Sequence, residues 1–263
     1  MTSPPSDLPP ALAARGLTVR VGGTVLVDGL DLDLAPGERV ALLGASGSGK
    51  SVTAAALTGS LPPGLVVTGS LVVGGEVVVP APGRRRSAPR TALVPQDSLF
   101  ALNPLVPVGR QLTRPWRRRG LDAHTARSRA AASLVSVGFT DAEAVLRRLP
   151  AELSGGQRQR VCIAMAAACD VPVLVADEPT TALDTVTQRQ VLDALRTVPA
   201  ALLLITHDVA VAAELCARVL VVHRGLLVDD LATDALLAGA GGPETRRLVG
   251  AVADPSAPRT GAA

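Results

Sequence analysis

The residues with the clearest chemical potential form a glycine-rich loop that ends in a lysine and a serine. Gly44 to Ser51 has the order Gly-Ala-Ser-Gly-Ser-Gly-Lys-Ser. The loop follows an apolar stretch at 39–43 that predicts a strand and opens a stretch at 51–58 that predicts a helix. Glycines in this context let backbone N–H groups converge on phosphate oxygens, so the loop is predicted to bind phosphate rather than to form an ordinary turn.

The phosphate loop also holds the only lysine of the chain, since the other 25 of its 26 basic residues are arginines. A compact ammonium and a forked guanidinium are not interchangeable where a loop wraps a phosphate. Lys50 is predicted to reach the β and γ phosphates, and the Ser51 hydroxyl to coordinate Mg²⁺. The predicted nucleotide-binding residues of the loop are Gly44, Ser46, Gly47, Ser48, Gly49, Lys50, Ser51 and Val52.

Two adjacent carboxylates follow the apolar run at 173–176. Asp177 is predicted to hold Mg²⁺, and Glu178 to orient or deprotonate an attacking water. Such a pair alone is equally typical of helix capping or of a solvated surface. Together with a phosphate loop it favours hydrolysis of a nucleoside triphosphate.

A third motif, Ser-Gly-Gly-Gln at 154–157, opens a predicted helix at 155–169. A hydroxyl at a helix N-terminus suits an anion, although a simple capped helix has the same local geometry. With these motifs in this order, residues from about 17 to 252 resemble the nucleotide-binding subunits of ABC transporters. The resemblance implies that Ser154 and Gly156 contact the γ-phosphate of ATP bound by an opposite subunit, so that catalysis requires a dimer.

The same resemblance implies roles for three further residues. Gln96 is similar to the Q-loop glutamine that senses Mg-nucleotide, Asp184 to the D-loop aspartate that joins the two sites, and His207 to the switch histidine on the γ-phosphate. Catalysis is then expected from Glu178, His207 and Lys50. The metal is expected at Ser51, Gln96 and Asp177, with ATP and Mg²⁺ as cofactors.

A narrower resemblance links the segments at 96–104, 108–111 and 245–249 to the dipeptide, oligopeptide and nickel importer family. It implies that the residues around Leu102-Asn103-Pro104 meet a permease, although a simple turn also fits that tripeptide. The implied partners are a second ABC ATPase subunit, two permease subunits and, indirectly, a solute-binding protein. We expect a paralogue in a heterodimer rather than a homodimer, at the cytoplasmic face of the membrane.

Members of the family commonly stack adenine on an aromatic residue of the first strand, but residues 18–21 contain none. No cysteine follows Cys216, so no iron–sulfur cluster is expected.

The elements that must position these motifs follow from the apolar pattern. Strands are predicted over 17–21 and 25–34, a hairpin over 71–79, and buried parallel strands over 172–176, 201–205 and 218–222. Helical spacing dominates 107–149. We therefore predict an α/β fold, a P-loop NTPase core with an antiparallel β region and an inserted helical subdomain at about 97–169. A single domain is expected over 15–254, with flexible tails at 1–14 and 255–263.

The composition limits the classes of protein that remain. No apolar run approaches the roughly 18 residues of a membrane-spanning helix. Three cysteines without a Cys-x-x-Cys pair argue against a disulfide framework or a zinc site. Eleven arginines between Arg84 and Arg129, including 84–86 and 117–119, favour a solvated surface over contact with acidic lipid, and no nucleic-acid module accompanies them. An exporter subunit, a soluble ABC-type ATPase of ribosomes or DNA, and a nucleotide-binding regulator remain as alternatives.

Overall fold

The computed structural model describes residues 9–79 and 90–253. The arginines at 84–86, residues 1–8 of the expected N-terminal tail and the whole expected C-terminal tail lie outside these residues. The described residues cluster into two compact units, one built from the chain up to Thr91 and from Ala201 onward, the other from Ala92–Ala200. The single domain expected over 15–254 therefore stays a prediction.

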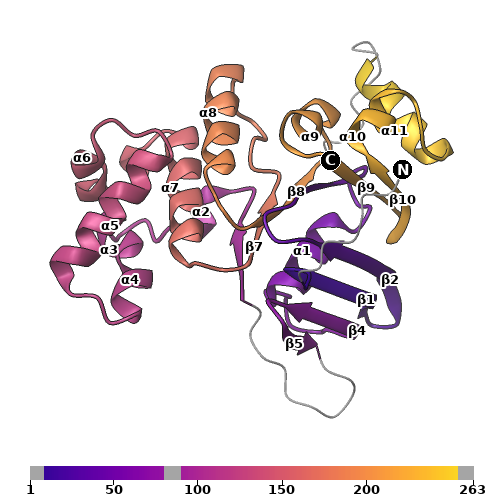
Figure 1. Cartoon of the computed structure of the whole chain (residues 1–263), viewed down its shortest axis with the longest axis horizontal. Coiled ribbons are helices and arrows are strands. Elements are labelled where there is room, and N and C mark those ends of the chain that lie inside the picture. Colours follow the sequence, from indigo (N-terminus) through magenta and orange to yellow (C-terminus); the bar gives the residue numbers. More distant parts are fainter. Residues whose placement is uncertain (1–8, 80–89, 254–263) are drawn as a thin grey trace. The chain divides into compact units, whose positions relative to one another are not determined.

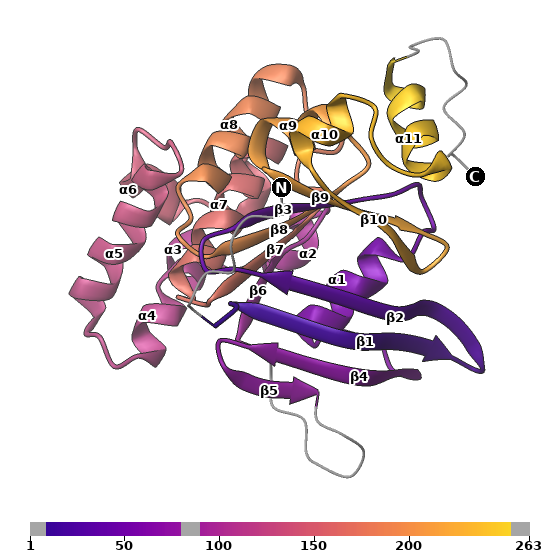
Figure 2. The same cartoon turned by 45° about the vertical axis from the view of Figure 1, so that its right-hand side comes forward.

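The first unit contains an antiparallel four-stranded sheet in the order β2-β1-β4-β5 (Figure 1). Its strands are β1 (Leu12–Val21), β2 (Thr24–Leu34), β4 (Leu65–Val73) and β5 (Glu76–Val79). β1 and β2 lie side by side, as do β1 and β4 (Figure 2). The expected boundary of the N-terminal tail at residue 14 is corrected, because Leu12 and Ala14 are fully buried in β1.

A second set of strands in this unit has the order β10-β9-β3-β8. These are β3 (Arg39–Leu43), β8 (Ala201–Thr206), β9 (Arg218–His223) and β10 (Leu226–Ala232). β3 pairs in parallel with both β8 and β9, whereas β10 runs antiparallel to β9. β8 is buried along its whole length, as the continuous apolar run predicts for a parallel strand covered on both faces. The helices of the unit are α1 (Lys50–Thr58), α9 (Val209–Leu215), α10 (Thr233–Leu237) and α11 (Pro243–Ala253).

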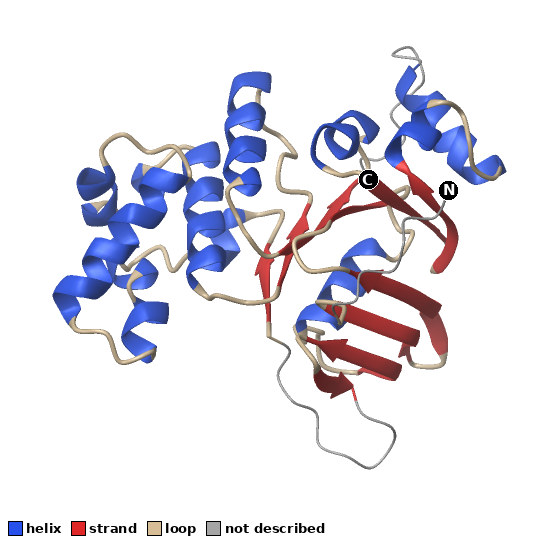
Figure 3. Ribbon diagram, viewed as in Figure 1, coloured by secondary structure: helices blue, strands red, loops and turns tan. Residues whose placement is uncertain are grey.

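The second unit is mainly helical (Figure 3). Two neighbouring strands, β6 (Thr91–Val94) and β7 (Val173–Asp177), accompany its helices, all but the last of which lie between these strands along the chain. The helices are α2 (Ser98–Ala101), α3 (Val108–Leu112), α4 (Arg114–Arg118), α5 (Ala123–Ser136), α6 (Ala142–Arg147), α7 (Gly155–Ala168) and α8 (Thr185–Arg196), with a 3-10 turn, η1, at Pro150–Glu152. The predicted helical segment at about 97–169 is occupied by α2 to α7. The strands β6 and β10 were not predicted.

Candidate functional site

The phosphate loop joins the end of β3 to the start of α1 in the first unit. Two of its glycines are required by their surroundings. A Cβ at Gly44 would lie 2.4 Å from the Val222 carbonyl oxygen and 2.5 Å from Ser48 Oγ. Gly49 has a φ of 105°, and a Cβ there would lie 2.9 Å from the Leu26 carbonyl oxygen. The close approach of β9 and β2 therefore fixes the shape of the loop.

The loop and the start of α1 provide a positive environment. Lys50 is buried, and its Nζ donates hydrogen bonds to the carbonyl oxygens of Gly44 at 2.7 Å and Ala45 at 3.0 Å. Within the described residues, no side chain caps the N-terminus of α1, its first turn has no acidic residue, and the buried Ser48 Oγ has no hydrogen-bond partner. Since a helix N-terminus attracts negative charge, these features fit a phosphate group.

The turn between β9 and β10 contacts the phosphate loop, and this contact was not predicted from the sequence. The Gly225 N–H donates to the Ser48 carbonyl oxygen at 2.9 Å, and the Gly225 carbonyl oxygen accepts from Asp28 N–H at 2.9 Å. Gly225 has a φ of 81°, and a Cβ there would lie 2.6 Å from the Leu26 carbonyl oxygen. The glycine between two apolar runs was the available signal in the sequence.

His207 lies at the same edge of the parallel strands as the loop. Leu43, the last residue of β3, pairs with Thr206, the last residue of β8. Gly44 and His207 therefore directly follow the carboxyl ends of two neighbouring strands. His207 is exposed, and the next residue, Asp208, caps α9 by accepting from the N–H groups of Ala210 and Val211.

The two carboxylates follow β7 in the second unit. Asp177 ends the strand, and Glu178 adopts a φ of 47°, a left-handed conformation that is uncommon for a residue with a side chain. Thr181 Oγ1 donates a hydrogen bond of 3.1 Å to Glu178 Oε2. The strained backbone and this contact orient the glutamate side chain, and strain of this kind concentrates at functional sites.

Ser154 caps α7 in the way the sequence predicts. Its Oγ accepts from Gln157 N–H at 3.3 Å, and Gln157 Oε1 accepts from Ser154 N–H at 3.0 Å. The same helix reaches the segment of Gln96, because Gln159 Nε2 donates to the Pro95 carbonyl oxygen at 3.1 Å. Gln96 itself is exposed, two residues after the end of β6.

Asp184 caps α8 by accepting from the Thr187 N–H at 2.9 Å and from Thr187 Oγ1 at 2.7 Å. These hydrogen bonds lower the pKa of Asp184, the backbone bond contributing most. The aspartate is therefore ionised at neutral pH, and both of its oxygens accept hydrogen bonds from Thr187.

The side chain of Gln111 holds the loop around Asn103 by hydrogen bonds. The N–H of Asn103 donates to Gln111 Oε1 at 2.9 Å, and Gln111 Nε2 donates to the carbonyl oxygens of Asn103 at 2.9 Å and Val106 at 2.7 Å. This arrangement presents Leu105 with 85% of its surface exposed, while Leu99 on α2 is 50% exposed. Leu105 is therefore an exposed apolar side chain on a loop that three hydrogen bonds fix.

The structure divides the predicted site residues between the two units. The first unit brings together the loop residues 44–52 and His207; the second holds Gln96, Ser154, Gly156, Asp177, Glu178 and Asp184. In residues 9–79 and 90–253, no three His, Cys, Asp or Glu side chains group as a metal site. No helix of the described part has the length and apolar content needed to cross a membrane.

Comparisons with known proteins agree with one another. Residues 27–181 match the family model described as "ABC transporter". The chain is 39% identical over 226 residues to the nickel import ATP-binding protein NikD of Pseudomonas putida, covering 84% of this chain and 87% of that protein. It is 37% identical over 220 residues to the oligopeptide transport ATP-binding protein AppD of Bacillus subtilis, covering 80% and 67%.

Solved structures share the fold at lower identity. An ATP-binding subunit of an ABC transporter is 23% identical with a TM-score of 0.72, covering 93% of this chain and 100% of that one. A dimeric ATP-binding cassette in a post-hydrolysis state, bound to ADP and Pi, is 24% identical with a TM-score of 0.69, covering 84% and 98%. These similarities confirm the predicted α/β ATPase fold.

Proposed function

The chain belongs to the ABC transporter family, and from this membership we propose that it is the ATP-binding and ATP-hydrolysing subunit of an importer. The solute is a peptide, nickel or a related small solute, and it passes through separate permease subunits. The similarity that spans 84% of the chain and 87% of a nickel import ATP-binding protein carries this proposal. The similarity to an oligopeptide transport subunit keeps both solute classes in it.

The phosphate loop would hold the phosphates of ATP. Lys50 and the N-terminus of α1 supply positive charge, and the exposed residues Ser46 and Gly47 leave the backbone of the loop accessible. Ser51, Gln96 and Asp177 would hold Mg²⁺, an ion that typically takes few protein ligands and completes its shell with phosphate and water oxygens. When bound, Mg²⁺ neutralises charge on the phosphate oxygens.

Glu178 and His207 would act on the hydrolytic step. The carboxylate of Glu178, oriented by Thr181, accepts a proton from the attacking water or fixes its direction. His207 and Lys50 stabilise the charge that develops on the γ-phosphate. Ser154, Gly156 and Asp184 would face the ATP held by a second subunit, so that each site is completed by two chains.

The partners follow from the family. We propose a second ABC ATPase subunit, a paralogue in a heterodimer, together with two permease subunits at the cytoplasmic face of the membrane and, indirectly, a solute-binding protein. The loop fixed by Gln111, with Leu105 exposed at its tip, is the surface that would meet a permease. Its exposed leucine and hydrogen-bonded backbone would form the contact with the permease.

Affinity purification tests this function. The tagged chain is recovered from detergent-solubilised membranes of its own host, and the co-purifying proteins are identified by mass spectrometry. We expect two permease subunits and a second ATPase. A Leu105→Asp variant should lose the permeases, whereas Val186→Asp on α8, where the residue is 68% exposed compared with 85% for Leu105, should keep them. Recovery of ribosomal or DNA-bound proteins from the soluble fraction, without permeases, contradicts the proposal.

A further inference from the structure

The backbone conformation of Gly156 does not explain why this residue is a glycine. It is the second residue of α7 and has helical geometry, where alanine is a better helix former than glycine. Its neighbour Gly155 has room for a side chain, because a Cβ there would meet only Leu183 Cδ2 at an ordinary 3.6 Å. The cause must therefore lie in what surrounds Gly156.

Thr187 occupies the place that a side chain at Gly156 would take. A Cβ on Gly156 would lie 1.9 Å from Thr187 Cγ2 and 3.4 Å from Thr187 Cβ. Real atoms do not approach so closely, so the threonine methyl packs directly on the backbone at the start of α7. Both residues belong to the second unit, where α7 and α8 are in contact.

Asp184 holds Thr187 in this position. The carboxylate accepts from the threonine N–H at 2.9 Å and from its hydroxyl at 2.7 Å, which fixes the direction of the methyl group. The Thr187 side chain thus connects the aspartate that caps α8 with Gly156, the second residue of α7.

We propose that Thr187 is a positioning residue that joins Ser154, Gly156 and Asp184 into one rigid surface of each subunit. This inference rests on the proposed function, in which these three residues face the ATP of the opposite subunit. A change at Thr187 then displaces the start of α7 without touching the phosphate loop of its own chain. Its effect is expected in turnover rather than in the binding of ATP.

A double-substitution cycle tests the packing in the nucleotide-free, full-length chain. Gly156→Ala should lower the melting temperature by about 5 °C, because its methyl collides with Thr187. Gly156→Ala with Thr187→Ser, which lacks the methyl, should recover at least half of that loss. Gly155→Ala is the matched control and should not lower the melting temperature. If the double variant has the same melting temperature as Gly156→Ala, the proposed packing is wrong.

The purified transporter complex tests the coupling to hydrolysis. Thr187→Ser removes the methyl and Thr187→Val removes the hydroxyl, so each should lower kcat about two- to ten-fold with an unchanged KM for ATP. Gly156→Ala should lower kcat further, and the double variant should return toward the Thr187→Ser value. The inference is overturned if kcat is unchanged in both single Thr187 variants. It is also overturned if the double variant recovers the melting temperature but not kcat. An unmodified complex that hydrolyses no ATP contradicts the proposed function instead, and leaves the melting cycle valid.

Discussion

At the residue scale, Lys50 shows why this arginine-rich chain has a lysine at one position. Its ammonium lies buried between the carbonyl oxygens of Gly44 and Ala45, inside the bend of the loop. A point charge with three donors fits between these oxygens, whereas the wider planar guanidinium of arginine does not.

We predict that both Lys50→Ala and Lys50→Arg weaken ATP binding. A hydrogen bond to a charged group contributes about 1.5–3 kcal/mol, which corresponds to a loss of roughly 10- to 100-fold in affinity. Isothermal titration calorimetry measures this loss. Arg246→Ala on α11 is the control and should bind ATP normally. If Lys50→Arg binds as tightly as the unmodified chain, charge alone is required and the geometric argument is incorrect.

The three cysteines differ in their exposure. Burial raises the pKa of the Cys162 and Cys216 thiols to about 12. Partial desolvation also raises the pKa of the Cys169 thiol, although the residue is exposed at the surface. Because the thiolate is the reactive form, a raised pKa leaves little of it at neutral pH.

Alkylation should therefore distinguish these cysteines. In the native protein at pH 8 we expect iodoacetamide to modify Cys169 first, at a rate that increases with pH, and to reach Cys162 and Cys216 only after unfolding. Peptide mass spectrometry of timed samples measures the order. Equal rates for all three thiols in the native protein would contradict the burial of Cys162 and Cys216.

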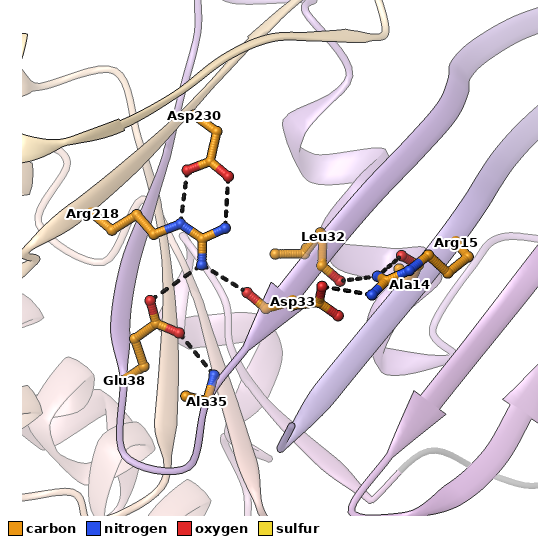
Figure 4. A network of polar contacts seen from close by, with 8 residues as sticks. All are labelled: Ala14, Arg15, Leu32, Asp33, Ala35, Glu38, Arg218 and Asp230. Carbon is orange, nitrogen blue, oxygen red and sulfur yellow. Dashed lines mark hydrogen bonds and ion pairs between the residues drawn. The ribbon is translucent and has the colours of Figure 1, made fainter. Parts of the chain in front are cut away.

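At the element scale, one arginine ties the two sheets of the first unit together (Figure 4). Arg218 on β9 donates two hydrogen bonds of 2.7 Å to Asp230 on β10. A third nitrogen donates to the Asp33 carbonyl oxygen on β2 at 3.1 Å and to Glu38 at 3.2 Å. The bond to Asp230 contributes most to raising the pKa of Arg218, so the residue stays charged.

Substitution of this arginine should cost stability. Arg218 is 30% exposed and its contact with Asp230 is bidentate, so Arg218→Gln is expected to remove about 1–3 kcal/mol and to lower the melting temperature by about 3–8 °C. Arg15→Gln is the matched control in the same network. Arg15 is 53% exposed, forms a single ion pair within the described residues, with Asp33, and also donates to the carbonyl oxygens of Ala14 and Leu32, so its loss should cost less than about 1 kcal/mol. Similar melting temperatures for the two variants would contradict this difference.

The elements that the sequence predicted are those with a clear apolar period. The parallel strands β3, β8 and β9 and the helix after the phosphate loop were identified within one or two residues. β10 was missed because it carries Asp229 and Asp230 in the middle of an edge strand. Their carboxylates are used in the fold, Asp230 by Arg218 and Asp229 by the Gly242 N–H. A partner distant in sequence gives no local signal.

The motif residues of the candidate site could be proposed from the sequence because their chemistry is local to short segments, and their roles stay predictions. Gly225 and Thr187 were missed because their roles depend on contacts with Ser48 and Gly156, 177 and 31 positions away in the sequence. These supporting contacts become visible only when the chain is folded.

At the scale of the whole molecule, the residues proposed to bind and hydrolyse ATP are distributed over two compact units of the chain. The phosphate loop and His207 belong to one unit, and Asp177 and Glu178 to the other. The proposed arrangement adds Ser154 and Gly156 from a second subunit. Hydrolysis then depends on the assembled transporter, and a change at one carboxylate should stop the reaction without preventing ATP from binding.

The most direct measurement is the steady-state release of phosphate by the purified transporter complex, with and without the Glu178→Gln substitution. The account predicts hydrolysis of Mg-ATP by the unmodified complex and a loss of about 100-fold or more in the variant, because a general base contributes roughly 10²- to 10⁴-fold. ATP affinity should stay within about two-fold, since the phosphate loop is unchanged. Equal rates in the two complexes would contradict the assignment of Glu178, and no hydrolysis by the unmodified complex would contradict the ATPase itself.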